Sequence, residues 1–291
     1  MRNIFIKKLT DLAKNNKNIF LLVADIGYGV VEEFQNKYPD RFLNVGVAEQ
    51  NMTGIAAGLA AEGYHVFTYS IANFPTFRCA EQIRNDIDYH NLSVTVVSVG
   101  GGVAYGNLGY SHHAVQDYGL MRMMPHFTIA SPGDPNEVVC ALEYLIKNPG
   151  PSYLRLGKNN EISVTEKNKK IQPGKWYGLN DNKGIDEIIL STGTALQWVL
   201  KNKNKFTGKD IYTIPIWGAN FKDSQKHFSS NFSSITTVED HIFDCGFGSW
   251  LREAVSFSKT NKDIKSYALP SNLKYVSASQ DKIMENLNLY N

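Results

Sequence analysis

The sequence has few cysteines, no long apolar run and almost no net charge. Its three cysteines (Cys79, Cys140 and Cys245) are odd in number, far apart and without a CxxC pair, which argues against a disulfide framework and favours a reducing cytoplasm. The longest apolar run, Ile19 to Ala24, is far too short to cross a bilayer, and the N-terminus lacks the apolar core of a signal peptide. Thirty basic residues stand against 28 acidic ones without a basic stripe, so we expect neither a membrane nor nucleic acid as a partner.

Several ligand-binding fingerprints are missing as well. After Gly100 and Gly102, the GxGxxG pattern would need a glycine at position 105, which is Tyr105. No GKS or GKT follows this glycine run, so both nucleotide fingerprints fail there. The adjacent His112 and His113 have no further Cys/His cluster that would complete a zinc site. The sequence therefore predicts no metal-binding residues on this chain.

What the sequence does contain is a regular alternation of strand and helix patterns. Short β-branched runs alternate with helical segments, which predicts an α/β fold of two domains, each with a mostly parallel sheet flanked by helices. We expect the first domain in residues 1–160, a polar connector in 161–184 and the second domain in 185–291. The predicted strands are Ile19–Asp25, Arg41–Gly46, Tyr64–Ser70, Ser93–Gly100, Phe127–Ser131, Ser152–Leu156, Glu187–Thr192, Asp210–Pro215, Ile235–Glu239 and Ile264–Leu269.

One helix start is well marked. Asp134 can cap a helix, Pro135 suits the first helical position, and Glu137 completes a capping box. A helix is therefore expected to begin at this point.

The segment from Gly46 to Ala60 predicts a helix with a carboxyl group on its apolar face. At helical spacing Glu49 shares a face with Met52, Ala56 and Leu59. A carboxyl group aimed into apolar surroundings can stay protonated and donate a hydrogen bond. The alternative is that Glu49 only occupies a first helical turn, where the helix dipole favours an anion.

Three other segments hold candidate site residues. Phe74 and Phe77 follow a strand and could stack on a planar heterocycle, although aromatics at this spacing are also common in cores. His112 and His113 lie in a glycine-rich loop after a strand, at the edge where open α/β sheets bind ligands; proton transfer is favoured over metal binding, with an ordinary loop position as the alternative. Arg155 could hold a substrate phosphate or form a surface ion pair.

Taken together, these segments resemble the second half of transketolase, and the likeness runs through nearly the whole chain. Asp25 and Ile26 stand in a segment similar to the strand end that faces the thiamine cofactor, and Glu49 in one similar to that of the cofactor-activating glutamate. Phe74 and Phe77 fall where the family places aromatics against the aminopyrimidine ring. The resemblance thus implies that these five residues bind thiamine diphosphate, and that Glu49 acts at N1′ of its aminopyrimidine.

The likeness continues into the substrate site and the second domain. Ser111-His112-His113 resembles the segment whose first histidine handles substrate hydroxyls, and Arg155 stands at the family's substrate-phosphate arginine. This implies catalytic roles for His112 and His113 and a substrate-binding role for His112 and Arg155. The segments that resemble other parts of the family are Ala130–Asp134, Ser191–Gly193, Val238–His241 and Gly246–Ser249.

Two departures from the family pattern bear on partners and substrate. The Gly-Asp-Gly segment with which the family holds Mg²⁺ and the diphosphate is missing, and the chain begins at the pyrimidine-binding half. We therefore expect thiamine diphosphate and Mg²⁺ to be bound together with a diphosphate-binding subunit equivalent to the N-terminal half, in an α2β2 assembly. The aspartate that full-length transketolases place shortly before the substrate histidine is also absent, which leaves the sugar substrate open.

Three functions follow from these features. The first is the subunit of a split transketolase that transfers a two-carbon ketol unit between sugars or sugar phosphates. The second is the β subunit of a 2-oxo acid dehydrogenase E1 component, which shares the two-domain plan. The third is a non-enzymatic α/β module. The Ser-His-His loop and the strand that carries Arg155 favour the first.

Overall fold

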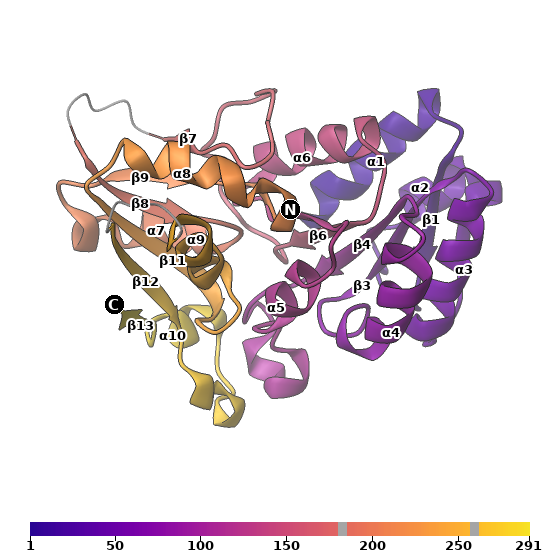
Figure 1. The fold of residues 1–291 in the computed structure, drawn as a ribbon. Helices are drawn as coiled ribbons and strands as arrows, with labels where there is room; N and C mark the ends of the chain where they lie inside the picture. Colours follow the sequence, from indigo (N-terminus) through magenta and orange to yellow (C-terminus); the bar gives the residue numbers. More distant parts are fainter. Residues whose placement is uncertain (180–184, 257–261) are drawn as a thin grey trace.

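The computed structural model describes residues 1–179, 185–256 and 262–291, and in them two mostly parallel sheets lie side by side (Figure 1). The first sheet has the strand order β10 (Ile216–Trp217), β5 (Thr128–Ala130), β6 (Ser152–Leu156), β4 (Val94–Val99), β3 (His65–Ile71), β1 (Ile19–Val23) and β2 (Phe42–Asn44). The second has the order β13 (Asn288–Tyr290), β12 (Asp263–Leu269), β11 (Ser234–Ile242), β8 (Glu187–Ser191), β9 (Asp210–Thr213) and β7 (Tyr177–Gly178). The predicted fold class is confirmed.

Each of the ten predicted strands corresponds to a strand of the structure, within a few residues at either end. The sequence pattern did not indicate β7, β10 and β13, which are two or three residues long and pair antiparallel at sheet edges. The position of β10 is unusual, because it comes from the second half of the chain and completes the first sheet. Its residues Ile216 and Trp217 pair with Ala130 and Ile129 of β5.

Helices cover both faces of the first sheet (Figure 1). One face packs against α1 (Arg2–Asn15), α2 (Glu32–Lys37) and α6 (Pro135–Lys147), and the other against α3 (Glu49–Ala61) and the segment Ile83–Asp88. Successive strand residues point to opposite faces, so Leu21 and Val23 join the first core and Leu22 the second. The remaining helices are α4 (Ala80–Gln82), α5 (Asp117–Arg122), α7 (Ala195–Lys201), α8 (Lys222–Ser230), α9 (Phe247–Ser256) and α10 (Gln280–Met284).

The predicted start of α6 is confirmed, but the Glu137 carboxyl binds a different amide from the one expected in a capping box. Asp134 is buried and accepts a hydrogen bond from the Glu137 amide at 2.8 Å, while Pro135 is the first helical residue. The Glu137 carboxyl accepts from the amide of Gly133 at 2.7 Å, one residue before the cap. Asp134 also accepts from the amides of Val164 and Thr165 at 2.7 Å each, so the same cap anchors the following segment.

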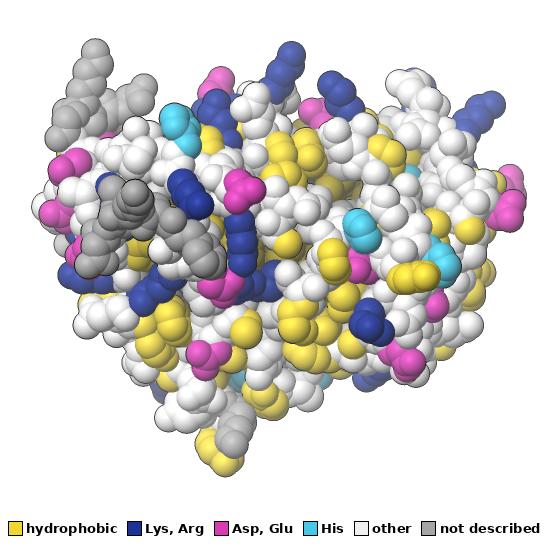
Figure 2. Space-filling model, viewed as in Figure 1, with side chains coloured by type: hydrophobic (Ala, Val, Ile, Leu, Met, Phe, Trp, Pro, Cys, Tyr) yellow, Lys and Arg dark blue, Asp and Glu magenta, His cyan; other side chains and the backbone are white. Residues whose placement is uncertain are grey.

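Surface features agree with the even charge balance of the sequence. On the face seen in Figure 2, basic and acidic side chains are interspersed among polar and hydrophobic ones. Within the described residues, no helix combines the length and apolarity needed to traverse a bilayer.

Candidate functional site

Asp25 lies at the carboxyl end of β1, in a conformation that non-glycine residues seldom adopt. Its φ of 52° is left-handed, and the strained position is held by Asn44 from the neighbouring strand β2, whose Oδ1 accepts from the Asp25 and Gly46 amides at 3.0 Å each. The Tyr28 hydroxyl donates to Asp25 Oδ1 at 2.7 Å and, together with Asn44, keeps the pKa of Asp25 below its usual value. Ile26 is partly buried against the core, so the strand end presents a carboxylate beside an aliphatic side chain.

Glu49 opens α3 and is buried, with a side chain only 1% exposed. It lies on the face of the helix that also buries Met52 and Ala56, as predicted. The prediction of a carboxyl donor in purely apolar surroundings does not hold in this structure. Arg78 donates to Glu49 Oε2 at 2.6 Å, so the carboxyl group accepts a charge-assisted hydrogen bond.

The two predicted aromatics differ in their surroundings. The Arg78 guanidinium lies over the ring of Phe74, with Cζ 4.7 Å from the centroid, and the ring of His112 meets Phe74 edge-on at 5.3 Å. Phe77 is 47% exposed and points away from the core. Phe74 therefore contacts both His112 and Arg78, the residue that binds Glu49.

The adjacent histidines differ in how far they are buried. His112 is half-buried, and its Nδ1 lies 3.0 Å from the Ser111 hydroxyl. His113 is fully buried, with Nε2 3.4 Å from the carbonyl of Gly106, and burial lowers its pKa. The two predicted histidines therefore differ in access: the ring of His112 is partly accessible and that of His113 is not.

Arg155 does not lie where a substrate phosphate could reach it. The side chain is 2% exposed, and its guanidinium forms ion pairs with Asp117 at 2.7 Å and Asp240 at 2.6 Å. Burial opposes its charge, but these two carboxylates hold its pKa above the usual value. The prediction of a phosphate-binding role is therefore corrected: the donors of Arg155 are used inside the protein.

Lys158, which no motif in the sequence marked, is the cation that lies nearer the site. It follows β6 three residues after Arg155 and is half-buried, with Nζ 4.8 Å from the centroid of Tyr105. The Tyr105 ring lies 6.3 Å from that of His112, so Lys158, Tyr105 and His112 follow one another in space. The signal available in the sequence was its place just beyond a strand end, where side chains leave the sheet.

A carboxyl group also organises the segments Val238–His241 and Gly246–Ser249 at the second sheet. Glu239 of β11 accepts from the amides of Phe247 and Gly248 at 2.6 and 2.9 Å and so caps α9. Its burial raises its pKa to about 8. A Cβ at Gly246 would lie 2.2 Å from this carboxyl, which explains the glycine.

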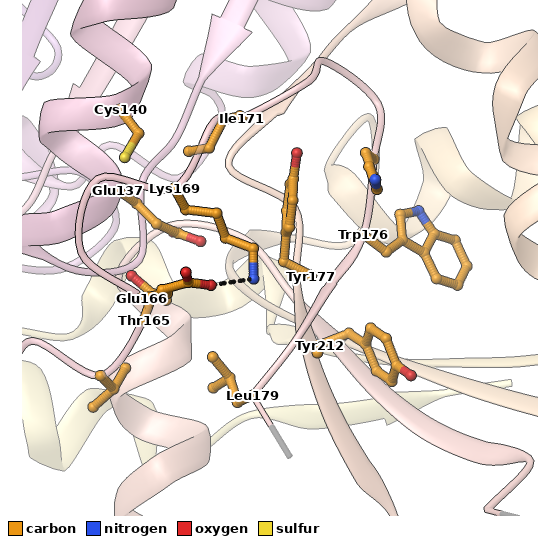
Figure 3. A pocket seen from close by; sticks show the side chains of 13 residues that line it. Glu137, Cys140, Thr165, Glu166, Lys169, Ile171, Trp176, Tyr177, Leu179 and Tyr212 are labelled. Carbon is orange, nitrogen blue, oxygen red and sulfur yellow. Dashed lines mark ion pairs between the residues drawn. The ribbon is translucent and has the colours of Figure 1, made fainter. Parts of the chain in front are cut away.

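A separate cavity of about 670 Å³ lies between α6, the segment 164–179 and β9 (Figure 3). Its lining includes Glu137, Lys169 and Tyr177, but none of the predicted site residues. The Lys169 ammonium points into the cavity and is already paired with Glu166 at 3.2 Å. The cavity is therefore distinct from the group around Glu49.

Exposed apolar side chains stand close in the sequence to Asp25, Glu49 and Arg78. The apolar side chains of Tyr28, Val47 and Phe77 are 75%, 74% and 47% exposed. No cluster of three or more potential metal ligands occurs in the part of the chain that the structure describes.

Comparisons with known proteins show relatives along most of the chain. The family described as "Transketolase, pyrimidine binding domain" matches residues 1–161. The putative transketolase C-terminal section of Methanocaldococcus jannaschii is 31% identical, covering 91% of this chain and 84% of that protein. One subunit of the apulose-4-phosphate transketolase of Actinobacillus succinogenes is 28% identical, covering 88% and 83%. Among solved structures, a split-gene transketolase described as an inactive beta4 tetramer superposes with a TM-score of 0.81 at 26% identity, covering 97% and 91%.

Proposed function

Because the chain belongs to the transketolase family, we propose that it is one subunit of a split, thiamine-diphosphate-dependent transketolase that transfers a two-carbon ketol unit between sugars. The chain corresponds to the C-terminal half of such enzymes, like the relative that is named as a C-terminal section and the relative that is one subunit of its enzyme. The observation that supports the proposal best is the buried Glu49, whose partner Arg78 lies over the ring of Phe74, which in turn contacts the half-buried His112.

The residues present fit the aminopyrimidine end of thiamine diphosphate. The Arg78 guanidinium is a planar donor held between the Glu49 carboxyl and the Phe74 ring, and an aminopyrimidine would require these same two contacts. When bound, thiamine diphosphate supplies the carbon centre that takes up and passes on the two-carbon unit. Glu49 would hold a proton at N1′, and Arg78, whose side chain is 45% exposed, has room to withdraw into solvent.

The remaining residues of the site would handle the substrate. His112, between Phe74 and Tyr105, would exchange protons with substrate hydroxyl groups. We propose Lys158 in place of Arg155 as the cation that meets an anionic group of the sugar. Asp25 and Ile26 would line the cofactor at the end of β1.

The proposal includes a partner subunit. The apolar side chains of Tyr28, Val47 and Phe77, each within three residues of Asp25, Glu49 or Arg78, are exposed, as expected for a surface that another polypeptide covers. That partner would bind the diphosphate and Mg²⁺, in an α2β2 assembly. The proposal also includes a cytoplasmic location. The three free cysteines support that location.

The proposal is tested by calorimetry with thiamine diphosphate and Mg²⁺, on this chain alone and mixed with a diphosphate-binding subunit. We expect binding only in the mixture, and loss of ketol transfer in Glu49→Gln and Glu49→Ala. Glu62→Gln is the matched control, because it makes the same change at the exposed far end of α3. Tight binding by this chain alone would contradict the need for a partner, and full ketol transfer by Glu49→Gln would contradict the role of Glu49.

A further inference from the structure

Arg155 uses its whole guanidinium group within the protein. Nε donates to Asp117 Oδ2 at 2.7 Å, and Nη1 donates to Asp240 Oδ1 at 2.6 Å and to the Tyr118 hydroxyl at 3.1 Å. Nη2 donates to the carbonyl of Ala114 at 2.8 Å. Two buried carboxylates and a backbone carbonyl thus share one cation, an arrangement that a planar group with five donors can satisfy and an ammonium cannot.

These partners belong to separate parts of the fold. Ala114 ends the loop of residues 100–114, here called the histidine loop, which carries His112. Asp117 begins α5, and Asp240 lies in β11 of the second sheet. Arg155 itself lies in β6 of the first sheet, so its side chain joins the histidine loop to both sheets.

The base of the histidine loop is closed at the point that Arg155 contacts. The Gly102 amide donates to the Ala114 carbonyl at 3.0 Å, and the Ala114 amide donates to the Gly102 carbonyl at 2.8 Å. The Ala114 carbonyl therefore accepts from Gly102 and from Arg155 at once. Beyond this closure, the loop brings the His112 ring to 5.3 Å from the Phe74 ring, centroid to centroid.

The loop base also fits the guanidinium sterically. A Cβ at Gly101 would lie 2.6 Å from Arg155 Nε, and a Cβ at Gly102 would lie 2.4 Å from Asp240 Oδ2. Gly102 additionally has a φ of +65°, which favours glycine. Both glycines are thus required for the loop to lie directly against the ion pairs.

From these contacts we infer that Arg155 is a positioning residue, which clamps the base of the histidine loop to the second sheet and thereby fixes His112 against Phe74. The inference rests on the proposed ketol transfer and gives Arg155 a role that needs no contact with substrate. Displacing a reacting group by about 1 Å can lower a rate by about 100-fold, so a loosened loop is expected to slow the reaction.

Two variants perturb the clamp in different ways. Arg155→Lys keeps the positive charge and removes the planar set of donors. Gly101→Ala keeps the arginine and displaces it, because the added methyl group would overlap Nε. Leu154→Ala is the matched control, since it makes a cavity at a buried neighbour on the same strand without touching the ion pairs.

The first readout is hydrogen exchange in the full chain alone, which needs no enzyme activity. We expect the amides of Gly102 and of residues 112–114 to exchange at least about tenfold faster in Arg155→Lys and in Gly101→Ala, but not in Leu154→Ala. Unchanged exchange in both clamp variants would overturn the inference. If Arg155→Lys does not fold, Gly101→Ala alone decides this result.

The second readout is the kinetics of the assembled enzyme with one phosphorylated and one unphosphorylated acceptor sugar. We expect kcat to fall by about 10- to 100-fold with both acceptors in the clamp variants, with KM nearly unchanged. A rise of KM confined to the phosphorylated acceptor would show that Arg155 binds phosphate and would overturn the inference. An equal loss of kcat in Leu154→Ala would also overturn it. A wild-type complex without ketol transfer would refute the proposed function, and the exchange result would still test the clamp.

Discussion

His65 offers a quantitative test of the core of the first sheet. It begins the interior strand β3, is 5% exposed and stacks on Phe67 with ring centroids 4.6 Å apart. Nε2 lies 2.8 Å from the Thr95 hydroxyl, and Nδ1 is buried with no hydrogen-bond partner among the residues that the structure describes. Burial lowers the pKa of His65 from 6.5 to about 4, because a charged imidazole would lose its hydration there.

The sign of the effect follows from the two states. Between pH 6.5 and pH 4, His65 is protonated in the unfolded chain and neutral in the folded one, so acid favours unfolding. Each tenfold difference in proton affinity corresponds to about 1.4 kcal/mol, so His65 should remove about 2 kcal/mol of unfolding free energy between pH 7 and pH 5 and about 3 kcal/mol by pH 4. Above pH 7 its contribution should be constant.

The measurement is urea unfolding at pH 7 and pH 5, followed by far-ultraviolet circular dichroism. His65→Gln cannot titrate and keeps an amide that can reach Thr95, so it should lose about 2 kcal/mol less than the wild type over this interval. His90→Gln is the control, because His90 is exposed and stays hydrated in both states. Equal losses in the wild type and His65→Gln would refute the reasoning.

Three further predictions concern the cap of α6 and the site. Asp134→Ala removes the acceptor of the α6 cap and of two connector amides, so urea unfolding should show a loss of about 1–3 kcal/mol; no loss would mean that these bonds are replaced by water. Phe74→Ala should weaken thiamine-diphosphate binding in the assembled enzyme by about tenfold, measured by calorimetry, and more than Phe77→Ala does, because Phe74 lies beside the partner of Glu49. The opposite ranking would assign the pyrimidine to Phe77. Lys158→Ala should raise the KM for a phosphorylated acceptor by about tenfold and leave the KM for an unphosphorylated acceptor unchanged. If the variant and the wild type had the same KM for the phosphorylated acceptor, a phosphate contact of Lys158 would be excluded.

The sequence predicted the features of the fold that depend on local patterns. The ten predicted strands follow from β-branched runs, and the α6 cap follows from three residues that lie within four positions. The edge strands β7, β10 and β13 could not be predicted, because no run of β-branched residues marks their two or three positions. They form because a neighbouring strand offers an unpaired edge, which is a property of the folded sheet.

The site was predictable in its residue types and less so in their environments. Glu49 was placed on the buried face of α3 from helical spacing alone. The burial of Arg155 depends on Asp117 and Asp240, which are 38 and 85 residues away in the chain, so no local pattern could reveal it. His112 and His113 are adjacent in sequence, and only the path of the loop decides that one is half-buried and the other fully buried.

The antiparallel pairing of β10 with β5 means that the two halves of this chain cannot be separated cleanly at the connector. A fragment that stopped near residue 160 would lose Ile216 and Trp217 and leave the amides and carbonyls of β5 without partners along one edge. It would also uncover the apolar surface that Trp217 shares with Tyr118. Such a fragment should pair with other chains through its unpaired edge and precipitate. The pyrimidine-binding half is therefore best produced as a chain that continues at least through residue 217.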